Sequence, residues 1–374
     1  MTIFDRIPGQ PTAKQMLLNS FNRGRLASTY LFYGADGVGK WPMAIALAAL
    51  LNCEKPRLGP DGSVIDACGE CRNCRQTENL IFPELHFALP LPPHKKEAEA
   101  IDLTREYLDQ KKAEPYRIIS SSRQLTIPID IAREIKRKTG IRLDKGVKRV
   151  ILFYQMEKML PASADSLLKL IEEPPPGTTI ILTANDPDNL LPTIQSRAQK
   201  ILFRSIPAAE IVRYLAEKHS LPIEKGTFAA RLAEGSLGRA LEFIGEEGEM
   251  PRRQTSFLMF KSIFLKDNPS AAATVNELAN PKDRGETEQT LLYWQSFLSD
   301  IILLKYGGNR SDLINVDLGA ELENLTSLVA APDDFSEILN NVKQVGLALR
   351  RNAHIRPALI SLVFKLKKHI NQTP

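Results

Sequence analysis

Residues 30–40, YLFYGADGVGK, join a short aromatic and aliphatic run to a glycine-rich loop. The run from Tyr30 to Tyr33 has the length and composition of a buried strand. An Ala/Leu/Ile-rich stretch from Met43 to Leu51 follows the loop and predicts a buried helix. Strand, glycine loop and helix in this order open a phosphate-binding α/β domain. The segment therefore predicts an α/β fold with a mostly parallel sheet.

Later segments continue the alternation of strands and helices. Further strands are predicted at 149–153 (RVILF), 179–182 (TIIL) and 200–203 (KILF). Ala164, Leu167, Leu168 and Ile171 share one helical face. That helix must end before the proline run at 174–176. We expect Asp130 to cap a second helix, which stops at Gly140.

The strand pattern stops near residue 205. Short helices are predicted at 208–219 and 228–244, and the polar run at 245–253 (GEEGEMPRR) is the best linker candidate. The apolar stripes beyond it predict helices; they are Leu291, Trp294, Leu298 and Ile301, and then Leu359, Leu362, Val363 and Leu366. The charged segment 94–115 is expected to be a solvated insertion without chemistry.

Composition excludes several classes of protein. The chain has 374 residues, of which 43% are hydrophobic and 25% charged, and its formal net charge is +5. These values exclude collagen-like, low-complexity and disulfide-dense secreted proteins. No apolar run is long enough for a membrane helix, and the first ten residues lack a secretory pattern, so we expect a cytoplasmic protein with no membrane partner. The small positive charge does not by itself establish nucleic-acid binding.

The glycine loop matches the phosphate-loop pattern G-x-x-x-x-G-K-[ST] at its first seven positions, from Gly34 to Gly39 and Lys40. Together with Gly37, these residues are the candidate nucleotide-binding set, because glycine amides can surround phosphate oxygens and lysine adds a positive charge. The eighth position should supply a hydroxyl for Mg²⁺, but it is Trp41. The pattern therefore predicts a phosphate loop without its metal-binding hydroxyl.

A second metal-binding group is also missing. An acidic residue is expected at the end of a later hydrophobic strand. The strand at 150–153 ends in Tyr154 and Gln155, and the first carboxylate is Glu157, in the turn that follows. Either another strand carries the acid or the ATPase chemistry has been lost. We expect no Mg²⁺ and no intrinsic ATPase activity, while the binding of ATP or ADP stays open, as does a glycine turn that binds nothing.

All four cysteines of the chain lie between residues 53 and 74. The candidate metal ligands are Cys53, Cys68, Cys71 and Cys74. The C-x2-C spacing, which occurs twice, lets thiolates reach one ion from a tight turn. Four thiolates form a closed structural site, which favours Zn²⁺; free cysteines and an iron–sulfur cluster are the alternatives.

Further short motifs accompany the glycine loop and the cysteines. They are Phe4-x2-Ile7-x-Gly9-Gln10, Gly24-Arg25-Leu26-Ala27, Tyr30-Leu31-Phe32-x-Gly34, Leu167-Leu168-Lys169-Leu170-Ile171-Glu172-Glu173-Pro174-Pro175, Asn185-Asp186-Pro187 and Leu191-Pro192-Thr193-Ile194-Gln195-Ser196-Arg197. Together, over about residues 3–240, these features resemble one family, the bacterial clamp-loader subunits of the DNA polymerase III holoenzyme. The missing metal-binding groups resemble the delta-prime branch of this family more than the ATP-hydrolysing gamma/tau branch.

The resemblance implies three domains. They are a P-loop AAA+ domain at 1–205 with an inserted zinc module at 53–74, a small helical lid at 206–248 and an all-α collar at 252–374. It also implies a rigid stator in a five-membered ring with gamma/tau and delta subunits. That ring loads a sliding clamp onto primed DNA.

Two short motifs concern ATP hydrolysis. The resemblance implies that Arg197, with Ser196 in the same motif, acts as an arginine finger in the ATP site of a neighbouring subunit. The family's lid motif Gly-Ser-x-Arg is changed here, because Gly238 stands at the arginine position and Arg239 comes one residue later. One residue is about 100° of helical rotation, so Arg239 is expected to face elsewhere.

Two other functions stay open at this stage. The chain could be an ATP-hydrolysing gamma/tau-type subunit if Trp41 and Gln155 are bypassed. It could also be a zinc-dependent nucleic-acid-binding protein with a relic phosphate loop, although Arg197 and the helical C-terminal third argue against this. Direct contact with DNA is permitted by the charge but not required by it.

Overall fold

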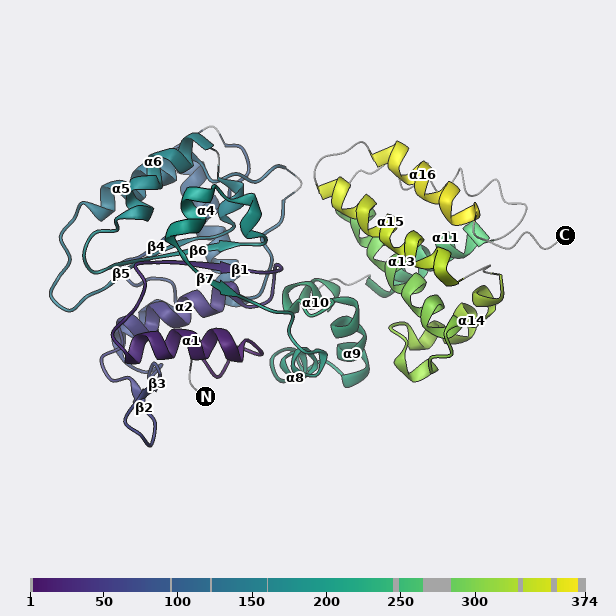
Figure 1. Cartoon of the computed structure of the whole chain (residues 1–374), viewed down its shortest axis with the longest axis horizontal. Helices are drawn as coiled ribbons and strands as arrows, with labels where there is room; N and C mark the ends of the chain where they lie inside the picture. Colours follow the sequence, from purple (N-terminus) through teal and green to yellow (C-terminus); the bar gives the residue numbers. More distant parts are fainter. Residues whose placement is uncertain are drawn as a thin grey trace. The chain divides into compact units, whose positions relative to one another are not determined.

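A computed structural model describes residues 3–94, 96–121, 123–159, 161–244, 249–264, 284–328, 332–350 and 355–368 (Figure 1). The contacts divide the chain into two compact units, Met1–Glu242 and Phe243–Pro374. The finer division into an AAA+ domain, a lid and a collar stays a prediction. Each unit is described separately below.

The first unit is built on a parallel five-stranded sheet. Its strands are β1 (Thr29–Tyr33), β4 (Leu85–Ala88), β5 (Arg149–Phe153), β6 (Thr178–Ala184) and β7 (Gln199–Leu202). Their order in the sheet is β4-β5-β6-β1-β7, with parallel pairing throughout. Every residue of β5 and β6 is buried, as expected for strands that are covered on both faces. The sequence prediction of a parallel sheet is confirmed, although β4 was not foreseen.

Helices cover both faces of this sheet. They are α1 (Pro11–Asn22), α2 (Lys40–Leu51), α3 (Arg72–Glu78), α4 (Glu97–Ala113), α5 (Ile129–Thr139), α6 (Pro161–Glu172) and α7 (Pro192–Arg197). Residues of α1 and α2 share one buried cluster, and residues of α5 and α6 share another on the opposite face (Figure 1). A small hairpin of β2 (Arg57–Leu58) and β3 (Val64–Asp66) lies between α2 and α3 in the chain.

Three expectations for this unit were wrong. The segment 94–115, expected to be a solvated insertion, is not wholly solvated, because it contains α4, which buries Tyr107 and Lys111. Asp130 is not a cap, since α5 begins at Ile129 after Pro128. The helix predicted from Met43 begins earlier, because α2 starts at Lys40 and has Pro42 in its first turn. A proline in the first turn is tolerated because the amides there have no intrahelical partner.

The last helices of the first unit follow β7. They are α8 (Ala208–His219), α9 (Ile223–Leu232) and α10 (Leu237–Ile244), of which the last two residues are counted with the second unit. The predicted single helix at 228–244 is split, because the chain turns at Glu234 and Gly235, both with positive φ. A Cβ on Gly235 would lie 2.5 Å from the Cβ of Ser205, so the turn requires glycine.

The second unit is helical. Its helices are α11 (Glu249–Phe264), α13 (Arg284–Lys305), α14 (Gly319–Ser327), α15 (Pro332–Arg350) and α16 (Ile355–Lys368). Both predicted apolar stripes are buried, with Trp294 and Leu359 fully inaccessible. The linker prediction was wrong for 249–253, which begin α11, while 245–248 lie outside the described residues. No helix in the described part of the chain is long and apolar enough to cross a membrane.

Candidate functional site

The phosphate loop connects β1 to α2. Gly34, Gly37 and Gly39 all have positive φ, which explains the need for glycine at these places. Lys40 begins α2, and only 4% of its surface is exposed. Its ammonium donates to the backbone oxygens of Gly34 and Ala35, the latter at 2.8 Å, so the lysine is turned back onto its own loop.

Asp36 is the acidic residue of this loop. Its carboxylate accepts hydrogen bonds from Asn185 Nδ2 at 2.7 Å and from Gln155 Nε2 at 3.2 Å, and lies 3.9 Å from Lys40 Nζ. Burial raises the pKa of Asp36. The Lys40 charge and the two amide donors lower it by more than burial raises it, so the net shift of the pKa is downward. Asp36 is therefore ionised at neutral pH.

Trp41 stands where the metal-binding hydroxyl is expected. Its indole is 3% exposed, stacks on Phe87 with ring centroids 5.4 Å apart and meets Tyr154 edge-on at 5.6 Å. These contacts place Trp41 in the apolar core, and an indole has no oxygen to offer a cation. The position thus contributes to packing and not to metal binding.

The carboxyl end of β5 also lacks an acid. Gln155, with φ of 55°, follows the strand, and its amide points to Asp36. Glu157 lies in a short 3-10 turn at Met156–Lys158, as the sequence predicted, and accepts from the Asn185 amide at 3.0 Å. Burial raises the pKa of Glu157, and nearby Asp36 raises it further. Glu157 Oε2 and Gln155 Oε1 are buried and have no hydrogen-bond partner among the described residues.

Lys111 of α4 is a buried cation beside this site, and sequence reasoning missed it. Its ammonium lies 5.3 Å from the ring centre of Trp41 and 4.4 Å from that of Tyr154, and it donates to the Arg117 carbonyl at 2.5 Å. The aromatic rings favour a cation. Loss of hydration opposes them more strongly and lowers the pKa of Lys111 to about 7.

The start of α10 packs directly on the phosphate loop. Ser236 Oγ donates to the Asp36 carbonyl at 2.6 Å, and the Gly238 amide donates to the Gly37 carbonyl at 3.1 Å. A Cβ on Gly238 would lie 2.6 Å from the Tyr116 carbonyl oxygen and 2.8 Å from the Gly37 Cα. No side chain fits there, so an arginine at this position would displace the loop or the helix.

The four cysteines come together from three places: the end of α2, the segment after β3 and the start of α3. The Sγ atoms of Cys53, Cys68, Cys71 and Cys74 all lie within 4.8 Å of one another. Thiolates around one tetrahedral zinc ion with Zn–S bonds near 2.3 Å are about 3.8 Å apart, and Cys68 Sγ lies 3.9 Å from Cys74 Sγ. The group could therefore hold a metal ion.

Backbone amides point at these sulfurs. Cys68 Sγ accepts from the amides of Cys71 at 3.3 Å and Glu70 at 3.4 Å, and Cys71 Sγ accepts from the Cys74 amide at 3.4 Å. Burial raises the pKa of Cys68, but the amides outweigh it and the pKa falls to about 7. Such N–H donors stabilise thiolates, the form that binds metal.

Arg197 ends α7 and is 43% exposed. Its Nε lies 3.3 Å from Glu172 Oε1, and its Nη1 donates to the Thr193 carbonyl at 3.3 Å. Ser196 Oγ donates to the same carbonyl at 3.1 Å, which is a local helical contact. The structure thus presents Arg197 at the surface, away from the four cysteines, and its role in a neighbouring site stays a prediction.

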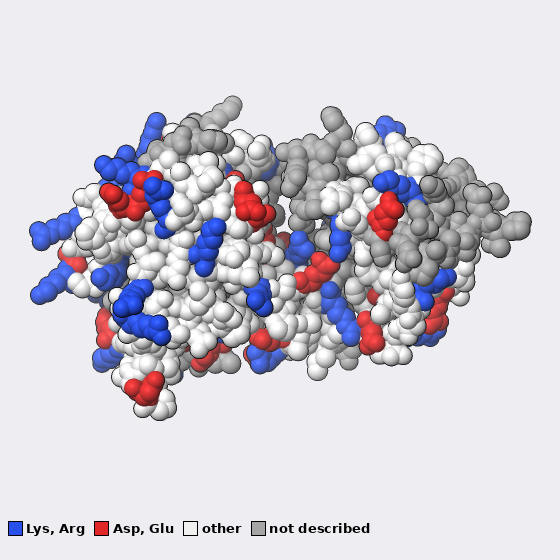
Figure 2. All heavy atoms as spheres, in the orientation of Figure 1, with Lys and Arg blue, Asp and Glu red and all other residues white. Residues whose placement is uncertain are grey.

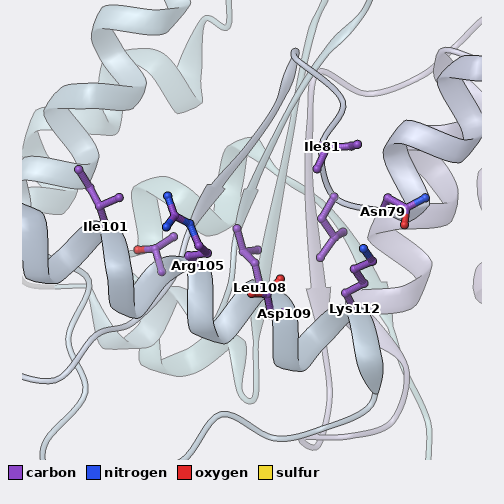
Figure 3. A pocket seen from close by; sticks show the side chains of 9 residues that line it. Asn79, Ile81, Ile101, Arg105, Leu108, Asp109 and Lys112 are labelled. Carbon is purple, nitrogen blue, oxygen red and sulfur yellow. The ribbon is translucent and has the colours of Figure 1, made fainter.

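A separate hollow of about 290 Å³ lies between α4 and the segment after α3 (Figure 3). Its lining residues are Asn79, Leu80, Ile81, Ile101, Thr104, Arg105, Leu108, Asp109 and Lys112. Ile81 and Ile101 are more than half exposed. None of the predicted site residues lines this hollow.

Comparison with known proteins decides the family. The family model described as “DNA polymerase III, delta subunit” matches residues 9–207, which is more than half of the chain. The chain belongs to this family. The delta-prime subunit of Bacillus subtilis polymerase III is 24% identical over 364 residues, 97% of this chain and 92% of that one. The Escherichia coli delta-prime subunit is also 24% identical, covering 93% and 87%.

The family member described here is therefore a delta-prime-type clamp-loader subunit, and it is also related to tau. Escherichia coli tau is 29% identical over 243 residues, but the match covers only 32% of tau. Among solved structures, a gamma subunit-related protein of Thermotoga maritima aligns over 96% of this chain and 98% of its own, with 14% identity and a TM-score of 0.38. The family assignment rests on the sequence matches, and the parallel sheet with its phosphate loop agrees with an AAA+ fold.

Proposed function

We propose that this delta-prime-type subunit is a non-hydrolysing stator of the clamp loader. The observation that carries the proposal is the buried Trp41, whose indole packs against Phe87 and Tyr154 at the position of the metal-binding hydroxyl. Without this hydroxyl and without an acid at the end of β5, the loop lacks both protein groups that hold Mg²⁺ in phosphate-loop ATPases. ATP hydrolysis in this chain is therefore not expected.

Arg197 gives the subunit a part in catalysis by a neighbour. A guanidinium keeps its charge at every physiological pH and fits the charge that spreads over a transferring phosphoryl group. Its exposure and its anchoring by Glu172 and Thr193 support this role, because the side chain is accessible yet oriented. The partners we propose are the gamma/tau and delta subunits in a five-membered ring, the sliding clamp and primed DNA.

Contact with DNA is supported by a basic segment that includes α5. Residues 130–148 hold seven Lys and Arg residues and three Asp and Glu residues, a net charge of +4 within a chain of net +5. Lys136, Arg137, Arg142, Lys145 and Lys148 are all exposed. Figure 2 shows Lys and Arg side chains projecting from the left edge of the molecule, where Figure 1 places the first unit. Such side chains suit the phosphate backbone.

We further propose that the four cysteines hold one structural Zn²⁺. A zinc ion with four thiolates has no position for water or substrate, so it would stabilise the segment from Cys53 to Cys74 and supply no catalysis. This segment connects α2 to α3, and its residues pack against the core cluster that contains α2. Zinc would therefore support the same helix that begins at the phosphate loop.

ATP turnover by the purified chain tests the function. The wild type and Lys40→Ala should both show background phosphate release, with and without primed DNA. Turnover by the wild type that disappears in Lys40→Ala would instead establish an ATP-hydrolysing gamma/tau-type subunit. A reconstituted loader that assembles and loads clamps equally well without this chain would refute the stator role.

A further inference from the structure

The phosphate loop carries its own anion. Asp36 lies within the loop, and its carboxylate is met by groups from three elements: Lys40 at the start of α2, Gln155 after β5 and Asn185 after β6. In a parallel α/β sheet the loops at the carboxyl ends of the strands form the ligand-binding edge. At this edge the side-chain amides of Gln155 and Asn185 therefore donate to Asp36, and the Lys40 ammonium lies 3.9 Å from its carboxylate.

The lysine has no donor left for a ligand. An ammonium has three N–H groups. Lys40 donates to the carbonyls of Gly34 and Ala35 and, at 3.0 Å, to Asn185 Oδ1, and it is also paired with Asp36. A phosphate could bind Lys40 only if it replaced these partners.

The loop is also covered from the side of α10. Ser236 and Gly238 bind the carbonyls of Asp36 and Gly37, and the Cα atoms of Gly37 and Gly238 are so close that neither residue has space for a Cβ. These contacts hold the start of α10 directly on the loop.

We propose that Asp36 is an internal occupant of the phosphate loop: its carboxylate takes the place of a nucleotide's phosphate beside Lys40, and α10 keeps the loop closed over it. This inference deepens the proposed function, because it explains how a non-hydrolysing subunit holds its former nucleotide site and the helix above it in one fixed arrangement. The loop then contains a latent anion site, and removal of the Asp36 carboxylate should make this site available to a phosphate.

The experiment measures anion binding by the full-length chain. Thermal unfolding is followed with and without pyrophosphate, at matched ionic strength, for the wild type, Asp36→Ala and Asp36→Asn. Asp188→Ala is the matched control, since Asp188 is an exposed carboxylate in the turn after β6. Removing Asp36 should lower the apparent Kd for pyrophosphate at least about tenfold relative to the wild type and to Asp188→Ala, because the competing charge is gone. Asp36→Asn keeps the side-chain volume and serves if the alanine variant does not fold.

Specificity is tested by a second substitution. Asp36→Ala combined with Lys40→Ala should lose the pyrophosphate-dependent stabilisation, because the cation that binds the anion is absent. The inference is overturned if neither Asp36 variant gains affinity, or if the double variant is stabilised as much as the single one. Both outcomes leave the stator role intact, since that role fails only if the wild type hydrolyses ATP or is dispensable in the loader.

Discussion

Arg197 Nε lies 3.3 Å from Glu172 Oε1, so the last residue of α7 is paired with the last residue of α6. Both side chains are about one-third to two-fifths exposed. An exposed ion pair of this kind contributes about 0–1 kcal/mol to stability. The pair therefore orients the guanidinium but holds it weakly enough to be exchanged for a negatively charged group on another molecule.

Arg197→Ala should slow ATP hydrolysis by a reconstituted clamp loader without preventing its assembly. An arginine finger contributes about three or more orders of magnitude to turnover, so the rate at the affected site should fall by a factor of about 10³. Folding should change by only about 0.5 kcal/mol, because the side chain is exposed. Steady-state phosphate release measures ATP hydrolysis, and size-exclusion chromatography measures assembly of the loader.

Arg197→Lys is the matched control for that substitution. Lysine keeps the charge but loses the planar fork, so only a small part of the rate should return. Glu172→Gln, which removes the anchor, should have a much smaller effect than Arg197→Ala. Loader turnover that is unchanged in Arg197→Ala would show that the arginine is a surface residue only.

Removal of the metal should destabilise the first unit. Protein purified without chelator is expected to contain about one zinc ion per chain, and Cys74→Ser should lose it. Cys74 is fully buried. Ser20, which is only partly buried in α1, offers a control substitution to Ala that should change neither the metal content nor the Tm. Elemental analysis and thermal unfolding measure both quantities. Wild-type protein without metal, or Cys74→Ser with a full zinc complement, would contradict the site.

The buried Lys111 predicts a specific pH dependence of stability. Loss of hydration lowers its pKa to about 7 in the folded chain, from the ordinary lysine value of 10.5. Between these two values the unfolded state binds more protons than the folded state, so stability rises with pH over this range. Lys111→Met removes this titration. The Tm difference between Lys111→Met and the wild type should therefore favour the variant more at pH 7 than at pH 9. In free energy of unfolding, this difference should change by roughly 1 kcal/mol per pH unit.

Lys112 provides the control for this experiment. It is the next residue of α4 but is exposed, so Lys112→Met should show the same Tm difference from the wild type at both pH values. Asp36, Lys40 and Glu114 are the charged groups that influence Lys111 most, and all three must be kept in both variants. A Tm difference for Lys111→Met that does not depend on pH would mean that the buried lysine stays charged throughout.

Much of the fold could be predicted from local sequence. The apolar runs that became β1, β5, β6 and β7 and the loop from Gly34 to Lys40 carry their own structural signals, and the spacing of the four cysteines identified a possible metal site. The split of 228–244 into two helices comes from the turn at Glu234 and Gly235, both with positive φ; Gly235 is a local turn signal that the prediction did not use. The strand β4 (LHFA) includes His86 and therefore does not form a continuous apolar run that sequence reasoning could detect.

The internal contacts of the phosphate loop could not be predicted in the same way. A negatively charged residue is unexpected in a loop that binds anions, so the sequence alone could have identified Asp36 as unusual. Its partners Gln155 and Asn185 come from distant strands, so only the folded sheet brings them together. Lys111 gave no signal, because it lies in a charged run whose composition is typical of surface. Its ammonium is buried against the rings of Trp41 and Tyr154.

The second unit contains a buried polar network whose loss should be costly. Asn315, which is fully buried, accepts from Arg253 Nε at 3.0 Å and donates to Asp300 Oδ2 at 2.7 Å. Asn315→Ala removes both hydrogen bonds, so the buried Arg253 and Asp300 each lose the Asn315 side chain as a partner. The unit should lose about 2–3 kcal/mol of stability. Asn324→Ala, at an exposed position of α14, should cost less than about 0.5 kcal/mol.

Tryptophan fluorescence can assign this loss to the second unit. The chain has two tryptophans, Trp41 in the first unit and Trp294 in the second. In a Trp41→Phe background, the emission of the buried Trp294 reports urea unfolding of the second unit alone. Asn315→Ala should move that transition to lower urea, and Asn324→Ala should not. If the two variants unfold at the same urea concentration, the Asn315 hydrogen bonds do not stabilise the unit. Arg253 and Asp300 would then be stabilised equally well by their other partners.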